Sequence, residues 1–521
     1  MVKIKMHRTI IFAAAIGGLT LTASGAAYSQ QEVCTLAITG VTIIDGNGGD
    51  ALRNGAVTVG GDRILDVGKS GDVDVASCAE KIDGRGKYLT PGFIDTNVHV
   101  SMLSRQIDYA RYFDRLKEIA IEGAQIHLKY GVTTIRDSYG VLEPLRDARD
   151  AIGRGEAVGA EIAFAGYFVG WGGHFSEMFR GREPESYFEE WVNDQITHGT
   201  GRDLAWKSPD ELRQAMNDYM DLGVDFVKVG LSDHDHNMPR LTFSLRQFEA
   251  MVEAVHARGL PIEVHATSPE SMVMAMQAGV DLIQHPEVMG VPITDEALQM
   301  LGEGNTICSL HGNNYTGKAW EMVLAQKPEK GGEEKEDNGA KKEKPDPFSR
   351  DAVLRDWPIP EPTTAAIQKK LKENNAFTIR ENAEKIIKTG CIITTATDNA
   401  PGMSPEFARD PNKWRQRQFG LGTIASIEAL VELGLPPAEA IVAATRNGAI
   451  ALRRLDDLGT IEAGKQADMV LLDKNPLRDI ANIRRVNAVI KRGKIVDRES
   501  LPNDPVYYGS APLPSSAAKS R

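Results

Sequence analysis

The chain has 521 residues, a formal net charge of −12 and only 4 cysteines. Its 42% apolar and 25% charged residues are typical of a soluble globular protein. The acidic balance and the lack of a basic stripe argue against nucleic-acid binding, and so few cysteines exclude a disulfide-based scaffold.

Residues 1–29 have the order of a secretory signal peptide. Lys3, Lys5 and Arg8 give a basic start, and the apolar run Thr9–Thr22 that follows is too short to span a bilayer comfortably. Small residues then precede the expected cleavage point. A membrane anchor is the alternative. We expect a periplasmic or secreted protein that leaves the membrane once the signal is cleaved.

That compartment permits disulfides. Cys34 and Cys78 both lie in the N-terminal β-rich segment and could pair. Cys308 and Cys391 lie in apolar strands, where we expect buried free thiols.

Both ends of the mature chain, residues 33–89 and 459–500, predict short strands separated by glycine-containing turns. The expected strands are Thr35–Ile44, Ala56–Val59, Arg63–Val67, Lys81–Leu89, Asp468–Leu472 and Ala488–Val496. Because isolated hairpins are only marginally stable, the two sets predict one small β-sandwich domain. Residues 501–521, rich in Pro, Ser and Ala, predict a flexible tail.

Residues 90–458 alternate β-branched runs with helical stretches, and several helices end at a glycine just before the next strand. The expected strands are Phe93–Asn97, Val132–Arg136, Ile162–Ala165, Phe226–Val229, Ile262–His265, Leu282–His285, Thr306–Leu310 and Ile392–Thr397. Such alternation implies parallel strands, and eight units predict an α/β fold of the (β/α)₈ TIM-barrel type.

Two stretches interrupt this rhythm. Gly166–Trp206 is long and rich in aromatic residues and glycine, as loops that shape a site often are. Residues 326–346 are nearly all charged or small and predict a mobile insertion.

Polar residues follow the expected barrel strands at their carboxyl ends, which share one mouth in such a barrel. They are Asn97, His99, Lys228, His265, His285 and Asp398. Imidazole and carboxylate are good zinc ligands. An ammonium cannot bind a metal, but a buried lysine can lose its proton, and carbamylation by CO₂ would make it an oxygen ligand able to bridge two ions.

Four segments carry a resemblance to the amidohydrolase superfamily, in particular its imidazolonepropionase-like and prolidase-like branches. They are Thr90–Thr96, Val132–Asp137, Ala444–Ala449 and Gly459–Val470. The resemblance implies one or two divalent ions, zinc first with manganese or cobalt as alternatives. The implied ligands are Asn97, His99, carboxylated Lys228, His265, His285 and Asp398, with Asp398 also catalytic.

Asn97 departs from the family pattern, in which strand one normally ends in His-x-His. The Asn-x-His form is similar to that of hydrolases acting on phenylureas and thiocarbamates. An asparagine oxygen is a weaker zinc ligand than imidazole, so a site with a single ion stays open. We predict that Asn97 binds the more weakly held ion through its side-chain oxygen.

Several further residues have weaker candidate roles. His174, in a Gly-Gly-His element, and His311, after the seventh strand, are candidates for substrate binding. The others are expected to be solvated (His234, His236), structural (Arg136, Asp468) or packed in the core (Tyr139, Tyr167).

The sequence therefore predicts hydrolysis of a C–N bond in a small-molecule amide, urea, carbamate or dipeptide by a metal-activated water. Asp398 would take the proton from that water and later deliver one to the leaving nitrogen. The alternatives are lactone or ester hydrolysis, deamination, or a non-catalytic binding protein. A homo-oligomer is left open.

Overall fold

The computed structural model describes residues 33–103, 106–233, 240–288, 290–317, 320, 376–401 and 419–501. The predicted signal peptide, the predicted insertion at 326–346, His234, His236 and the tail beyond residue 501 lie outside these ranges.

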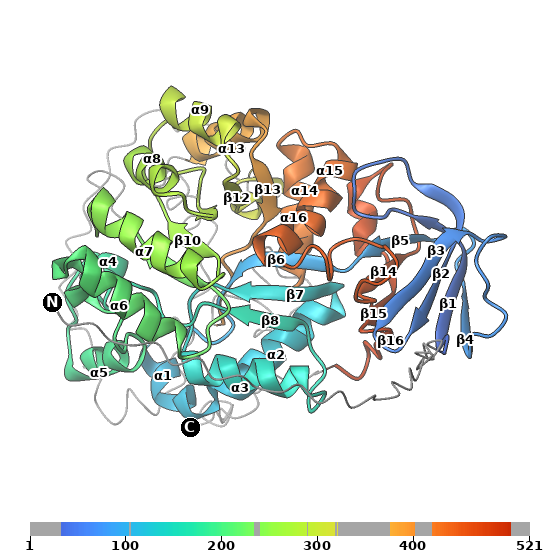
Figure 1. Ribbon diagram of the computed structural model, residues 1–521, viewed down its shortest axis with the longest axis horizontal. Coiled ribbons are helices and arrows are strands. Elements are labelled where there is room, and N and C mark those ends of the chain that lie inside the picture. The colour runs from blue at the N-terminus through green and yellow to red at the C-terminus, as the bar shows by residue number, and fades with distance from the viewer. Residues whose placement is uncertain are drawn as a thin grey trace, which may run out of the picture.

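Strands from both ends of the chain form one sheet, at the right of Figure 1. Its members are β1 (Leu36–Ile43), β2 (Leu52–Gly60), β3 (Arg63–Lys69), β4 (Glu80–Asp83), β5 (Tyr88–Pro91), β14 (Met469–Leu472), β15 (Val486–Lys491) and β16 (Lys494–Ile495). The order is β16-β15-β14-β5-β1-β2-β3, with β4 on β1. Antiparallel pairing of β5 with β14 joins the two ends, as the sequence predicts. The two-layer sandwich stays a prediction.

The single strand predicted for Lys81–Leu89 is wrong, because the chain turns in its middle. Gly84 accepts a hydrogen bond from the amide of Lys87, and Gly86 has a φ of 77°, in the left-handed region that favours glycine. The segment therefore forms two strands, β4 and β5.

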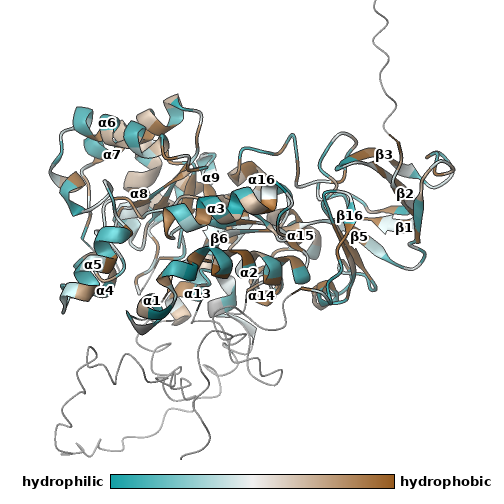
Figure 2. Cartoon of the chain, turned by 90° about the horizontal axis from the view of Figure 1, so that it is seen from below, coloured by the Kyte–Doolittle hydropathy of each residue, from teal (hydrophilic) through white to brown (hydrophobic). Residues whose placement is uncertain are grey.

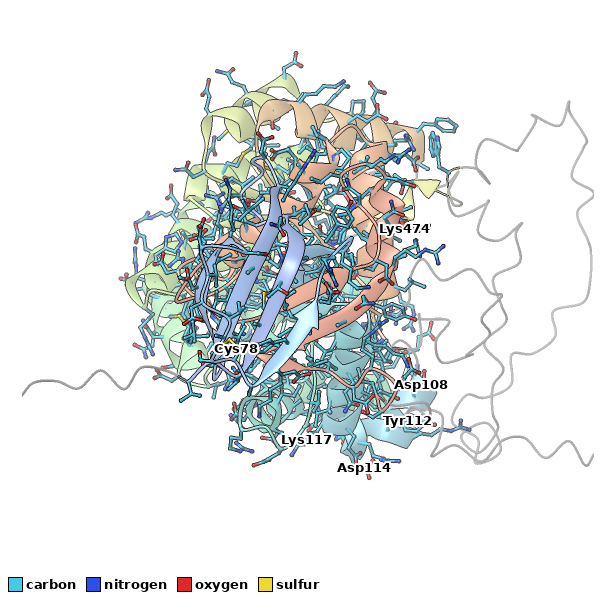
Figure 3. All side chains as sticks on the ribbon, turned by 90° about the vertical axis from the view of Figure 1, so that its right-hand side faces the viewer. Cys78, Asp108, Tyr112, Asp114, Lys117 and Lys474 are labelled. Atoms are coloured by element: carbon cyan, nitrogen blue, oxygen red, sulfur yellow. A yellow bond between two sulfur atoms is a disulfide. The ribbon has the colours of Figure 1, made fainter. Side chains whose placement is uncertain are left out.

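The described cysteines form two disulfides. Cys34 pairs with Cys78, which lies beside the small sheet in Figure 3. Cys308 pairs with Cys391, so the expectation of two free thiols is wrong. The reason is strand order: β12 (Ile307–Leu310) and β13 (Ile392–Thr395) are neighbours, which brings the two Cα atoms to 6.2 Å.

The central strands are all parallel and follow one another in chain order. One sheet holds β6 (Phe93–Val98), β7 (Val132–Asp137) and β8 (Glu161–Phe164), and the other holds β9 (Val227–Gly230), β10 (Ile262–His265), β11 (Leu282–Gln284), β12 and β13. Parallel bridges connect the sheets at both edges, between Val98 and Asn399 and between Val169 and Val229. The carboxyl ends of all eight strands therefore open toward the same side.

Helices cover these strands and turn their hydrophobic sides inward (Figure 2). Serine N-caps begin several of them, and Ser208 and Ser244 each form a capping box. The helices and helical turns are α1 (Gln106–Tyr112), η1 (Phe113–Arg115), α2 (Leu116–Lys129), α3 (Leu142–Gly153), α4 (Glu177–Arg180), α5 (Tyr187–Gln195), η2 (Arg202–Trp206), α6 (Pro209–Met220), α7 (Leu245–Ala257), α8 (Pro269–Ala278), α9 (Asp295–Glu303), η3 (Gly312–Asn314), α13 (Ala376–Thr389), α14 (Leu421–Glu432), α15 (Pro437–Ala443), α16 (Arg446–Ala451) and η5 (Ile480–Arg484). Across the described residues, none of the helices combines the length and apolar character that crossing a bilayer requires.

Candidate metal centre

All the sequence-predicted ligand positions lie at the carboxyl ends of the central strands. These positions are Asn97 in β6, His99 just after it, Lys228 in β9, His265 ending β10, His285 after β11 and Asp398 after β13. The asparagine, the lysine and the histidines are all buried.

Asp398 is the carboxylate on which several of these side chains converge. Its Oδ1 lies 2.9 Å from Nε2 of His99 and 3.3 Å from Nδ2 of Asn97. Burial alone would raise the pKa of Asp398. The hydrogen bond from His99 and the positive potential of His285, His99 and His311 outweigh burial and hold that pKa well below its usual value. The site therefore keeps this carboxylate ionised.

His99 lies between two acceptors. Its Nδ1 is 3.0 Å from the carbonyl oxygen of Tyr139, and its Nε2 faces Asp398. Burial lowers the pKa of His99. The hydrogen bond to Asp398 and the negative charge of that carboxylate raise the pKa by more, so the net shift is upward. The arrangement favours a positive charge between His99 and Asp398. A divalent cation ligated by both would supply that charge in place of the proton.

Lys228 is 1% exposed and lies in a charged network among the central strands. Its Nζ is 3.4 Å from Oε1 of Glu263, and the other oxygen of Glu263 is 2.9 Å from Nη1 of Arg136. Burial lowers the pKa of Lys228 to about 8, against the opposing pull of Glu263 and Asp398. A sizeable fraction of this amine is therefore neutral near physiological pH, which is the form that can react with CO₂.

His265 and His285 lie together on the other side of the site, with ring centroids 4.6 Å apart. The backbone φ is 60° at His285 and 57° at Asp398, a region that few residues other than glycine adopt. Strain of this kind gathers where the surrounding structure must aim a side chain. Both residues turn into the site at the point where their strands end.

His311, predicted as a substrate-binding residue, lies inside this group. Its Nε2 is 2.9 Å from Nδ2 of Asn97, and its ring stacks on that of His285 at 4.2 Å. One ligand atom each from His285, His311 and Asp398 lie within 4.8 Å of one another, which makes the three a possible metal site. On the far side of the ring, Nδ1 of His311 is 3.4 Å from Glu287, a residue that sequence reasoning missed.

His174, the other predicted substrate residue, lies farther out. It is 4% exposed, contacts Arg180 through Nε2 and packs its ring on Phe179 at 4.5 Å. Phe179 in turn packs on Tyr139 at 6.0 Å, and Tyr139 on His99 at 6.3 Å. An aromatic layer thus separates His174 from the metal-site residues, and its role in substrate binding stays a prediction.

That aromatic layer is a feature the sequence did not reveal. The rings of Phe168 and Trp171 stack with their centroids 4.4 Å apart. Their centroids lie 5.8 and 4.8 Å, respectively, from that of the His265 ring. The Phe168 ring also lies 5.1 Å from the ring of Tyr139. Gly230, at the end of β9, makes room for it, since a Cβ there would lie 2.0 Å from the Trp171 indole nitrogen. We call Tyr139, Phe168, Trp171 and Phe179 the aromatic wall.

Two buried carboxyl groups, those of Asp95 and Asp137, accept hydrogen bonds from residues next to the proposed ligands. Asp95 accepts hydrogen bonds from the hydroxyls of Thr423 and Thr397, at 2.7 and 2.9 Å, and so fixes the residue that precedes Asp398. Burial raises the pKa of Asp95 to about 6, and burial raises that of Asp137 to about 7. Asp137 accepts from the amide of Val100, next to His99, at 2.6 Å.

Comparison with known proteins shows the family of the chain. Residues 88–496 match the Amidohydrolase family, so the chain belongs to it. It is similar to the imidazolonepropionase of Alkaliphilus oremlandii (strain OhILAs), with 23% identity over 85% of this chain and 90% of that protein. A stronger match, 36% identity to the imidazolonepropionase of Geobacillus sp. (strain WCH70), spans only 25% of that protein.

Solved structures are similar over almost their whole length. Molinate hydrolase has a TM-score of 0.75 and 30% identity, covering 93% of this chain and 99% of that one. Phenylurea hydrolase B has a TM-score of 0.74 and 29% identity, covering 91% of this chain and 99% of that one. A Xaa-Pro dipeptidase has a TM-score of 0.65 and 23% identity, covering 88% of this chain and 99% of that one, and is similar in fold. These relatives imply a TIM-barrel-type fold and support the assignment of this chain as a hydrolase.

Proposed function

We propose that this chain is a metal-dependent hydrolase that cleaves a C–N bond, on a closed (β/α)₈ barrel with a small β-sandwich domain. The observation that carries the proposal is the convergence of His99, His285 and His311 on the ionised carboxylate of Asp398, at the mouth where barrel enzymes hold their active sites. The domain limits are those predicted from the sequence.

The donor set fits a divalent ion. Imidazole nitrogens and a carboxylate suit zinc, and the amide of Asn97 adds a harder donor that suits manganese or cobalt. The side-chain oxygen of Asn97 is buried and has no hydrogen-bond partner within the described part of the chain. Lys228, once carboxylated, would hold one or two ions together with His99, His265, His285 and Asp398.

A divalent ion held by these residues would lower the pKa of water to near neutral and would polarise the scissile carbonyl. The chain's own contribution is proton transfer and orientation. Asp398 lies where it can accept a proton at Oδ1 from the attacking water and then deliver a proton to the leaving nitrogen. The hydrogen bond from His99 and the surrounding histidines outweigh burial and keep the Asp398 carboxylate ionised, and therefore able to accept a proton, before the reaction begins.

The aromatic wall supports a substrate with an apolar or aromatic substituent. Its rings pack directly on His99 and His265, so a substrate that reaches the ion lies beside them. The identities of 30% to molinate hydrolase and 29% to phenylurea hydrolase B point in the same direction. We therefore propose neutral ureas and carbamates, including thiocarbamates, before dipeptides, lactones or deamination substrates.

The test is a substrate panel run on one preparation. The protein is chelated, and separate samples are reloaded with zinc, manganese or cobalt and assayed on phenylureas, thiocarbamates, aryl amides, dipeptides and lactones. We expect chelation to remove turnover and reloading to restore it, fastest on a urea or carbamate. Turnover that prefers lactones would support the alternative hydrolysis. A loaded protein that turns over nothing would favour the binding protein.

Export is a separate proposal. The expected signal peptide and the two disulfides support a periplasmic or secreted location, since disulfides persist in oxidising compartments. Sequencing the N-terminus of protein recovered from a periplasmic extract would test it. Mature protein beginning near Gln30 is expected, and recovery of the intact chain from membranes would support the anchor instead.

A further inference from the structure

This chain lacks the first histidine of the family's His-x-His pattern, and another imidazole lies beside the position that it would occupy. Asn97 occupies the position where the family normally has a histidine, and the side chain that lies against it is the imidazole of His311. His311 comes from the end of β12, on the neighbouring side of the site, and is 2% exposed. An imidazole is thus present beside the position that has lost one.

The placement of His311 suits a metal ligand. One nitrogen of His311, one of His285 and an oxygen of the Asp398 carboxylate lie within 4.8 Å of one another. Two ligands of one tetrahedral zinc ion, each bonded at about 2.0–2.2 Å, lie about 3.5 Å apart. The three side chains would therefore draw closer by rotamer adjustment to share an ion.

The contact with Asn97 also sets the tautomer of His311. Nε2 faces the amide group of Asn97, whose N–H donates, so Nε2 carries the lone pair. Nδ1 then carries the proton and lies 3.4 Å from the carboxylate of Glu287, without a hydrogen bond to it. A histidine whose outer nitrogen points at a carboxylate while its inner lone pair points into the site is the usual arrangement of a metal-bound imidazole.

Asn97, in contrast, presents its amide nitrogen to Asp398 and His311, and its buried oxygen has no hydrogen-bond partner among the described residues. A nitrogen that donates cannot bind a metal. In this arrangement Asn97 acts as a hydrogen-bond donor that holds His311, and the stronger donor at this corner of the site is the imidazole.

We propose that His311 takes over the metal-ligand role of the missing first-strand histidine, sharing an ion with Asp398 and His285. The proposal rests on the metal dependence proposed above and reassigns His311 from substrate binding. It also makes Asn97 a positioning residue for His311 rather than the principal ligand.

The experiment measures metal binding, not turnover. Chelated wild type and His311→Asn are titrated with cobalt, following visible absorption and the number of ions retained after gel filtration. His127→Asn is the matched control, since His127 is equally buried but lies in α2, where its Nδ1 donates to the Gly123 carbonyl. We expect His311→Asn to weaken one site by more than about tenfold and change its spectrum, and the control to bind as wild type does.

The swap variant decides between a ligand and a merely structural histidine. Asn97→His combined with His311→Asn returns the imidazole to strand one, and we expect it to recover much of the affinity that His311→Asn loses. His311→Gln serves as a second variant if the asparagine misfolds. Unchanged cobalt affinity and spectrum in both single variants, or no recovery in the swap, would overturn the proposal. A wild type that binds no ion at all would instead overturn the proposed function.

Discussion

At the carboxyl ends of the central strands, histidines and Asn97 surround the single carboxylate Asp398, whereas at the amino ends arginines lie beside carboxylates of their own. A cavity of about 480 Å³ opens at the amino ends. There Arg149 pairs with Asp225 at 3.1 Å, and Glu161 contacts Arg454 and lies 3.5 Å from Arg492.

The difference indicates which end of the strands suits a bound cation. The arginines of the amino end pair with carboxylates of the protein, so they link the central strands to the small sheet without any ligand. At the carboxyl ends, histidine nitrogens lie around the carboxylate of Asp398, and such a set of ligand atoms suits a cation.

The largest effect is expected from Asp398. Replacing it by Asn, which tolerates the left-handed φ of 57° at this position, should lower kcat by at least about 10³-fold, because the proton acceptor is lost. Thermal unfolding should change little. Steady-state kinetics on a metal-loaded enzyme measures this, with Arg492→Ala at the amino end as the control. A near-normal kcat at normal metal content would remove Asp398 from the mechanism.

The second-largest effect is expected from replacing Lys228. Lys228→Ala is expected to lose metal and activity by at least about tenfold, since the carboxylated side chain would be a ligand. Added short carboxylic acids should restore part of both. Lys465→Ala is the control, because Lys465 is also buried but bonds to Thr460 in the small-sheet region. Full activity of Lys228→Ala without any added acid would show that the lysine is not a ligand.

Glu161 tests the other end of the comparison. Its pKa falls to about 2 because Lys491, Arg454 and Arg492 outweigh its burial, which alone would raise the pKa. A depressed folded-state pKa stabilises the protein above the unfolded pKa of about 4.5, and that contribution is lost as the pH falls toward 2.

Glu161→Gln should therefore lower the free energy of unfolding near neutral pH by roughly 3 kcal/mol and leave kcat unchanged. The difference from wild type should shrink as the pH falls below about 4.5. Denaturant unfolding at several pH values measures it. Glu156→Gln removes a charge from an exposed pair with Arg154 and should change stability far less, because solvent screens that pair. Equal effects of the two variants would contradict the distinction.

Much of the site followed from the sequence because parallel strands end on one side. His99, Lys228, His265, His285 and Asp398 each follow or end a β-branched run, and that rule alone brings them together. The pairing of the two chain ends into one sheet followed from the marginal stability of isolated hairpins.

What the sequence could not provide is direction and adjacency of side chains. The contact of His311 with Asn97 depends on how two side chains leave different strands. The bond between Cys308 and Cys391 depends on which strands are neighbours. The approach of Trp171 to His265 depends on the path of a long loop and on the absence of a Cβ at Gly230.

The most direct test of the central claim is the rate of urea or carbamate hydrolysis by one protein sample before chelation, after chelation and after reloading with a divalent ion. The account predicts that turnover disappears with the ion and returns in proportion to the ion bound. Hydrolysis that persists in fully metal-free protein would contradict it.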